Sequence, residues 1–310
     1  MPVPDFQSLM LPTLKALADE VESPLPTIRE RVARAENLTL EDRQEMLSSG
    51  SQSVLSNRVN WAMTYMARAG LLERVRRGVY RLTEEGRRLL SRSPARINTQ
   101  LLQEYSGFAE WRTKSKQSPP GQVADATKQI TESADTPEEA LGKAVRELSE
   151  ALEADVLDRV RAAQPEFFEQ VVVDLLIAMG YGGGDATRGR VTGCSGDGGI
   201  DGTIQEDVLG LDEIYIQAKK YADSNTVGAG ALRNFAGALV AAGTNKGVFV
   251  TTSGFTPAAR DYVERSPQRI VLIDGNELAH RMVEHDIGVR IRKQYQTKRV
   301  DEDYFEPDAQ

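Results

Sequence analysis

The chain has 310 residues, with 46 acidic and 38 basic side chains and a net charge of −8. This length predicts about two domains, and 40% apolar with 27% charged residues is typical of a soluble globular protein. One cysteine and two histidines exclude a disulfide framework, a cysteine-based zinc site and a multi-histidine metal cluster. Any metal chemistry must therefore use oxygen ligands. No apolar run approaches the roughly 18 residues that span a bilayer, and the N-terminus lacks a signal pattern, which predicts a cytoplasmic protein with no membrane partner.

Residues 1–95 are predicted to form a mostly helical domain. The expected helices cover residues 9–17, 25–35, 40–47 and 54–70. In the last of these, Leu55, Val59 and Met66 share one face, as in an amphipathic helix. The sequence then alternates around Arg77-Gly78, as in a short hairpin. Helices followed by a hairpin with a basic tip are the layout of a winged helix–turn–helix domain.

The charge of this region is opposite to that of the whole chain. Residues 58–92 contain nine arginines and three glutamates, an excess of six positive charges. Arginines on a hairpin suit contacts with DNA phosphates, which position a reading helix, although an ordinary solvated surface is the alternative. We predict that these residues bind DNA: Asn57, Arg58, Asn60, Arg74, Arg76, Arg77 and Arg81.

Two segments separate this domain from the C-terminal half. Residues 96–136 are polar and poor in large apolar side chains, which predicts a linker. Residues 137–163 predict a long connecting helix with an apolar stripe that includes Leu141, Val145 and Leu148. The sequence leaves open whether this helix is a connector, a dimer contact or the first helix of the next domain.

Residues 164–295 alternate strand and helix patterns, which predicts an α/β/α sandwich, and residues 296–310 form a C-terminal tail. Within the sandwich, a glycine-rich turn leads to Asp201. The later segment around Gln217 and Lys219 alternates as a half-buried strand, with these two side chains on one face. If the two strands pair as a hairpin, the three side chains meet at one end of the sheet.

An acid on one strand, with an amide oxygen and a lysine on the next, suits metal-dependent hydrolysis of a phosphodiester. Mg²⁺, or Mn²⁺, prefers oxygen ligands such as those of Asp201 and Gln217, and it activates water. Lys219 could orient or deprotonate that water, and Glu169 on a predicted helix could add a carboxylate. Each residue alone is more often a turn residue or a solvated face. Their joint occurrence in this order predicts a nuclease.

Several runs of sequence resemble the Mrr-type restriction endonucleases. In the C-terminal half these are FE at 168–169, MGYGG at 179–183, GDGGIDG at 196–202, QAK at 217–219 and GVFVTTSGF at 247–255. In the N-terminal region they are NR at 57–58, WA at 61–62, AGL at 69–71 and LT at 82–83. The resemblance therefore runs along most of the chain. Thr251, Thr252 and Ser253, within the last of the C-terminal runs, either touch DNA phosphates or are ordinary strand hydroxyls.

The resemblance implies a restriction-endonuclease-like core of the PD-(D/E)xK type, with Asp201, Gln217 and Lys219 at its signature positions and Glu169 as the helix carboxylate. It also implies type IV restriction of modified, typically methylated, double-stranded DNA, in the cytoplasm and at the nucleoid. Most of the wider superfamily carries Asp or Glu where this chain has Gln217, but the Mrr-like branch has glutamine. Because a neutral amide oxygen binds Mg²⁺ more weakly than a carboxylate, we expect weak metal affinity with Asp201 as the main ligand.

Two other functions remain open on the sequence. The chain could be a DNA-binding regulator with an inactive nuclease core, or a structure-specific repair nuclease or resolvase. The complete set of Asp201, Gln217 and Lys219 favours catalysis, and the winged-helix domain favours duplex recognition. Because cutting both strands needs two active sites, we expect a homodimer or a larger homo-oligomer.

Overall fold

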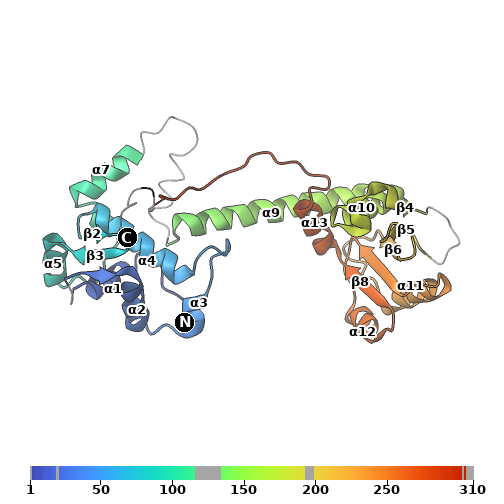
Figure 1. Ribbon diagram of the computed structural model, residues 1–310, viewed down its shortest axis with the longest axis horizontal. Helices are drawn as coiled ribbons and strands as arrows, with labels where there is room; N and C mark the ends of the chain where they lie inside the picture. The colour runs from blue at the N-terminus through green and yellow to red at the C-terminus, as the bar shows by residue number, and fades with distance from the viewer. Residues whose placement is uncertain (1, 19–20, 116–133, 193–198, 302–303, 305–310) are drawn as a thin grey trace. The chain divides into compact units, whose positions relative to one another are not determined.

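Figure 1 shows the computed structural model, which describes residues 2–18, 21–115, 134–192, 199–301 and 304. The chain divides into two compact units, Met1–Arg146 with Lys298–Gln310, and Glu147–Thr297. The two ends of the chain therefore belong to the same unit. Among the described residues, no helix is both long enough and apolar enough to cross a membrane.

The first unit is mostly helical, with a small antiparallel sheet of strand order β1-β3-β2. Its elements are α1 (Met10–Ala16), β1 (Ser23–Pro24), α2 (Leu25–Ala35), α3 (Leu40–Gln44), α4 (Val54–Arg68), β2 (Leu72–Arg76), β3 (Val79–Leu82), α5 (Glu84–Ser91), α6 (Thr99–Leu102) and α7 (Ser106–Ser115). The β2–β3 hairpin turns at Gly78, whose φ of 69° suits a residue without a Cβ. Helix α4 followed by this hairpin is the predicted winged-helix layout.

Helix α4 forms for the reasons that its sequence suggests. Ser53 precedes it and accepts a hydrogen bond from the Ser56 backbone N–H at 3.2 Å, which caps the first turn. Val59 and Met66 on the predicted apolar face are fully buried. The apolar face of α4 therefore packs into the core of the first unit, as predicted.

The predicted linker begins too early. Ile97, Leu102 and Phe108 are each 0% exposed and belong to the same core as α4. Trp111 adds an edge contact with the Tyr65 ring, with centroids 5.6 Å apart. A few apolar side chains at the right spacing are enough to dock α6 and α7, although the segment is polar on average. The rest of the predicted linker, residues 116–133, lies outside the described residues.

The predicted connecting helix is present as α9 (Pro137–Ala162). Its C-terminal part packs into the second unit, where Val156, Leu157 and Val160 are buried. This part of α9 is therefore the first helix of the second unit, one of the three roles that the sequence left open.

The second unit is built on a five-stranded sheet of order β4-β5-β6-β7-β8. Its elements after α9 are α10 (Pro165–Ala178), η1 (Tyr181–Gly184), η2 (Ala186–Arg188), β4 (Gly189–Val191), β5 (Gly202–Gln205), β6 (Glu213–Lys219), α11 (Ala229–Ala241), β7 (Lys246–Thr251), α12 (Pro257–Arg265), β8 (Arg269–Ile273) and α13 (Gly275–Glu284). The pairs β4–β5 and β5–β6 are antiparallel, whereas β6–β7 and β7–β8 are parallel.

Helices cover both faces of this sheet, which confirms the predicted α/β/α sandwich. One face packs against α9, α10 and α13, with Ile216 at 1% exposure, and the other packs against α11 and α12, with Phe249 at 0%. The predicted alternation of β6 is present from Glu213 to Ile216, but it fails at Gln217, because β6 is a central strand with a helical layer on each side. As a result Gln217, predicted on the polar face, is itself only 5% exposed.

Candidate nuclease site

The β5–β6 hairpin brings two of the predicted site residues face to face. Gly202 pairs with Ile216, so the preceding Asp201 lies opposite Gln217. The Asp201 N–H donates to the Ile216 carbonyl at 2.8 Å, and its Oδ2 accepts from the Ala218 N–H at 2.7 Å. These two hydrogen bonds fix both the backbone and the carboxylate of Asp201 against β6. The remainder of the glycine-rich turn, residues 193–198, lies outside the described residues.

Gln217 presents a buried carbonyl oxygen with no partner. Its Oε1 has no hydrogen bond within the described part of the chain. A Cβ on Gly199 would lie 2.4 Å from Gln217 Nε2, and Gly199 has a φ of 88°, so glycine is required for this close approach. An unsatisfied buried acceptor costs about 1–3 kcal/mol. Gln217 therefore suits a ligand that offers positive charge to an oxygen atom.

Glu169 on α10 adds a second carboxylate to this end of the sheet. Burial raises the pKa of Glu169 above its ordinary value, and the negative charges of Asp201 and Glu166 raise it further. The charge of Asp201 is thus one cause of the raised pKa of Glu169. No group of three or more His, Cys, Asp and Glu side chains suited to a metal occurs in the described residues. The donors present are instead two carboxylates and one amide oxygen, which fit a hard cation such as Mg²⁺.

Lys219 is the last residue of β6 and lies two residues beyond Gln217 on the same face of the strand. It pairs with Thr251 of β7, and its carbonyl accepts hydrogen bonds from Thr251 Oγ1 at 2.8 Å and from the Thr252 N–H at 3.3 Å. The structure thus brings Asp201, Gln217 and Lys219 to one end of the sheet.

The three hydroxyl residues at the end of β7, Thr251 to Ser253, are buried. Thr251 and Thr252 are 0% exposed and Ser253 is 5% exposed, and their hydroxyls bind backbone groups at the end of β6 and in the segment after it. Of the two roles predicted for these residues, the phosphate contact is therefore excluded by burial.

In the first unit, α4 and the β2–β3 hairpin line a cavity of about 1220 Å³. Asn60, Arg74 and Arg77, three of the predicted DNA contacts, line it. Thr64, which we also expected on the polar face of this helix, lines the same cavity. Arg68 lines it too and was not among our predicted DNA contacts, although it follows Thr64 at helical spacing on one face of α4. The described residues of the C-terminal tail also contribute to its wall, among them Asp301.

Two predicted DNA contacts are wrong. Asn57 is 1% exposed, and its Oδ1 accepts a hydrogen bond from Thr136 Oγ1 at 2.6 Å. Arg58 forms an ion pair with Glu139 at 2.7 Å and donates to the backbone carbonyl of Val3. Both side chains lie on the side of α4 that packs against the start of α9, so they hold the fold of the first unit together.

The two remaining arginines of the prediction lie on the hairpin and stay largely exposed. Arg76 has an ion pair with Glu22 at 3.4 Å, and its side chain is 70% exposed. Arg81 pairs with Glu73 across the two strands at 2.5 Å, with 47% of its side chain exposed. Exposed ion pairs of this kind are weak, so both side chains can exchange their partners for a phosphate.

Comparisons with known proteins match both units. A family model described as "Restriction endonuclease" matches residues 160–282, and a model described as "Mrr N-terminal domain" matches residues 6–92. A curated protein of Escherichia coli strain K12, the type IV methyl-directed restriction enzyme EcoKMrr, is 37% identical over 311 residues. That alignment covers 99% of this chain and 100% of the relative.

Two solved structures also show similarity. The DNA modification-dependent restriction endonuclease AspBHI is 21% identical, with a TM-score of 0.37 over 45% of this chain and 36% of its own. The MspJI restriction endonuclease, solved in complex with a 27-mer oligonucleotide, is 18% identical, with a TM-score of 0.33 over 68% of this chain and 49% of its own. This chain thus matches less than half the length of either structure.

Proposed function

Because the chain belongs to the Mrr family of restriction endonucleases, we propose that it is a Mg²⁺-dependent type IV enzyme that cuts methylated double-stranded DNA. Family membership confirms the resemblance seen in the sequence motifs and makes the chain a DNA-cleaving hydrolase. The metal and the methylated substrate are our proposal. The observation that carries it is the meeting of Asp201, Gln217 and Lys219 at one end of the sheet, where the buried carbonyl of Gln217 has no hydrogen-bond partner among the described residues.

Asp201 and Gln217 are the residues that would hold Mg²⁺. The negative charge of Asp201 also raises the pKa of Glu169. When bound, the ion would supply positive charge beside the scissile phosphate and make water more acidic. The Ala218 N–H holds the Asp201 carboxylate in place, so this ligand needs no rearrangement. Mn²⁺ suits the same oxygen donors.

Lys219 would act on the phosphate itself. Its ammonium group, two residues beyond Gln217 on the same strand face, can donate hydrogen bonds to a phosphate oxygen and offset the negative charge that develops there. It can also orient the attacking water. A lysine suits this task because it provides a compact charge with three rotatable donors.

We propose that the first unit recognises the DNA. Asn60, Arg74 and Arg77 line one cavity with α4, which supports a reading helix placed against DNA with the hairpin on the phosphates. The preference for methylated DNA rests on the relative from Escherichia coli, whose name describes it as methyl-directed. Such a substrate would place the enzyme in the cytoplasm, at the nucleoid when DNA is bound.

A plasmid-cleavage assay tests this proposal. With Mg²⁺, wild-type protein should cut methylated plasmid faster than unmethylated plasmid, and EDTA should abolish the cleavage. The Asp201→Ala variant should cut neither plasmid. Asp212→Ala is the matched control, because it removes an exposed aspartate from the loop of the same hairpin. Cutting by Asp201→Ala would refute the site, and equal cutting of both plasmids would refute the methyl preference.

We also propose that the enzyme works as a homodimer. A duplex has two strands to cut, and a closed two-fold arrangement supplies two sites. Helix α9 exposes four apolar side chains at alternating spacings of four, three and four residues, as in a coiled-coil seam. They are Leu141, Val145, Leu148 and Leu152, exposed by 43%, 55%, 71% and 40%. A second copy of the same helix is the partner that this spacing fits.

Leu148→Glu tests the seam, because a carboxylate there would have to be buried in the dimer. We expect it to shift the protein from dimer to monomer in analytical ultracentrifugation. Arg146→Glu, on another side of α9, should leave the dimer intact. A wild-type protein that sediments as a monomer at micromolar concentration, alone and with DNA, would refute the dimer.

A further inference from the structure

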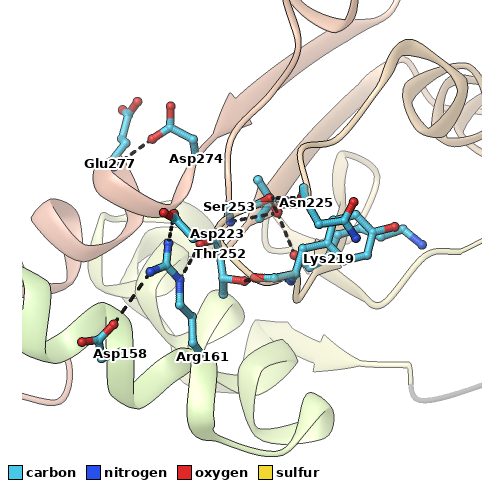
Figure 2. A network of polar contacts seen from close by, with 11 residues as sticks. Asp158, Arg161, Lys219, Asp223, Asn225, Thr252, Ser253, Asp274 and Glu277 are labelled. Carbon is cyan, nitrogen blue, oxygen red and sulfur yellow. Dashed lines mark hydrogen bonds and ion pairs between the residues drawn. The ribbon is translucent and has the colours of Figure 1, made fainter.

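The pairing of β6 with β7 ends at Lys219. This is the residue whose ammonium group is proposed to bind the phosphate. Beyond this point the chain leaves the sheet, and its backbone groups need other partners. Three consecutive hydroxyl residues at the end of β7 provide them. We call Thr251, Thr252 and Ser253 the hydroxyl clamp; Figure 2 shows Thr252 and Ser253 beside Lys219.

The clamp holds the chain on both sides of the point where β6 ends. Thr251 Oγ1 donates to the Lys219 carbonyl at 2.8 Å. Thr252 Oγ1 donates to the Tyr221 carbonyl at 2.7 Å and accepts from the Tyr221 N–H at 2.9 Å. Ser253 Oγ donates to the Asn225 carbonyl at 2.8 Å. One hydroxyl thus fixes both backbone groups of a residue two positions after Lys219.

The backbone of the clamp is itself held by two neighbouring elements. Arg161 near the end of α9 donates from Nε to the Thr252 carbonyl at 3.0 Å and binds Asp223 at 2.5 Å, as Figure 2 shows. On the other side, the Gly275 N–H at the start of α13 donates to the Ser253 carbonyl at 2.8 Å. A Cβ on Gly275 would lie 2.5 Å from the Thr252 carbonyl oxygen, so α13 packs tightly on the clamp.

We propose that Thr252 and Arg161 are positioning residues for Lys219. The inference rests on the proposed function of Lys219, and neither residue needs to touch the substrate. A lysine side chain is long and flexible, so the direction of its backbone decides where the ammonium group can reach. A displacement of about 1 Å in a reacting group can lower a rate by about a hundredfold, which makes a rigid backbone at residue 219 valuable.

The first test measures the position of Lys219 without any cleavage. An amine-reactive reagent labels the protein, and tandem mass spectrometry follows the labelling rate of Lys219 relative to Lys246, which lies at the other end of β7 and binds Glu206. We expect Thr252→Val to raise this ratio at least about twofold, because local opening exposes the ammonium group more often. Thr252→Ser, which keeps the hydroxyl, should retain the wild-type ratio.

Thr256→Ala is the stability control, because it removes the hydroxyl that caps α12 in the same unit and should lower the unfolding midpoint. A labelling ratio in Thr252→Val equal to that in Thr256→Ala would overturn the positioning role.

The second test measures single-turnover cleavage at saturating DNA, well below the unfolding midpoint of every variant. Thr252→Val should cut about tenfold to a hundredfold more slowly while its Kd for DNA stays within about twofold of wild type, and Thr252→Ser should restore most of the rate. If Thr252→Val changes the labelling ratio of Lys219 but leaves the cleavage rate unchanged, the inference is also overturned. If no protein cuts, wild type included, while the labelling contrast persists, the proposed function fails and the clamp still positions Lys219.

Arg161→Gln provides a milder variant in case Thr252→Val does not fold, because the side chain of Arg161 is 25% exposed. Its matched control is Arg159→Gln on the same helix, where the side chain is 76% exposed and pairs with Asp155. Arg161→Gln should raise the Lys219 labelling ratio and slow cleavage, whereas Arg159→Gln should do neither. Equal behaviour of the two variants would remove Arg161 from the proposal.

Discussion

At the scale of single residues, two groups of the proposed site lie in surroundings that cost the folded protein free energy. Gln217 buries a carbonyl oxygen that has no partner among the described residues, and Glu169 is partly buried near the charge of Asp201. Both groups would gain from a nearby positive charge, as the proposed Mg²⁺ would supply. Removing either cost should therefore stabilise the protein while damaging its activity, a common trade-off at active sites.

The pH dependence of stability tests whether the surroundings of Glu169 destabilise the folded protein when its carboxylate is charged. Its pKa in the folded protein is raised above the unfolded value, so the folded state binds more protons, and this contribution to stability is present at low pH and is lost as the pH rises through the folded pKa. In EDTA, Glu169→Gln should therefore gain thermal stability over wild type at pH 7, and less or none at pH 4. Glu264→Gln, an exposed carboxylate change on α12, should show no such difference. A Glu169→Gln protein less stable than wild type at pH 7 would contradict the charge argument.

Gln217→Glu tests the neutral ligand. A carboxylate in place of the amide should bind Mg²⁺ or Mn²⁺ more tightly in isothermal titration calorimetry, because an anionic oxygen interacts more strongly with a hard cation. In EDTA the same variant should unfold at a lower temperature, since a further negative charge is buried near Asp201. Unchanged metal affinity would show that Gln217 is not a ligand.

At the scale of elements, most helices and strands were predictable because their apolar spacing is regular. The apolar face of α4 and the β5–β6 hairpin follow directly from the sequence, and the hairpin alone brings Asp201 to Gln217. The wrong predictions concern residues whose burial is determined by segments far away in the sequence. Asn57 resembles an exposed polar residue on α4, but Thr136, 79 positions later, buries it. The hydroxyl clamp could likewise not be predicted as a unit, because its partners lie about 30 positions earlier, at the end of β6 and in the segment after it.

The β2–β3 hairpin carries a prediction at this scale. Changing Arg74 and Arg77 together to Ala should weaken binding to all duplex sequences alike and lower the slope of log affinity against log salt by about two, because each arginine is expected to neutralise one phosphate. Fluorescence anisotropy at several salt concentrations measures this slope. Changing Arg87 and Arg88 of α5 to Ala removes the same charge and should have a smaller effect. Equal effects would mean that the hairpin has no special contact with DNA.

At the scale of the whole molecule, the net charge of −8 conceals opposite local charges. Residues 58–92 carry an excess of six positive charges, whereas residues 301–308 contain five acidic residues and no basic one. The described part of that tail, at Asp301, lines the same cavity as Arg74 and Arg77. Asp301 therefore places one negative charge, beside the positive charge of Arg299, at the surface where DNA phosphates are expected to bind.

Asp301→Asn should consequently raise the affinity for duplex DNA at low salt, by about fivefold at most, since an exposed charge contributes no more than about 1 kcal/mol. The gain should disappear at high salt because of screening. Asp261→Asn, an exposed aspartate on α12, changes the net charge equally and should leave the affinity close to wild type. An equal gain in both variants would indicate a general effect of net charge.

Both ends of the chain belong to the same compact unit, which has a consequence for how such enzymes diversify. The catalytic unit, Glu147–Thr297, is in effect an insertion within the unit that carries the winged helix. A single genetic crossover between two relatives would separate α4 and the β2–β3 hairpin from their own tail, so the cavity that they line together would combine residues of two parents. Exchange of a complete reading unit needs two crossovers, near residues 146 and 298, and chimaeras with new DNA preferences should be built the same way.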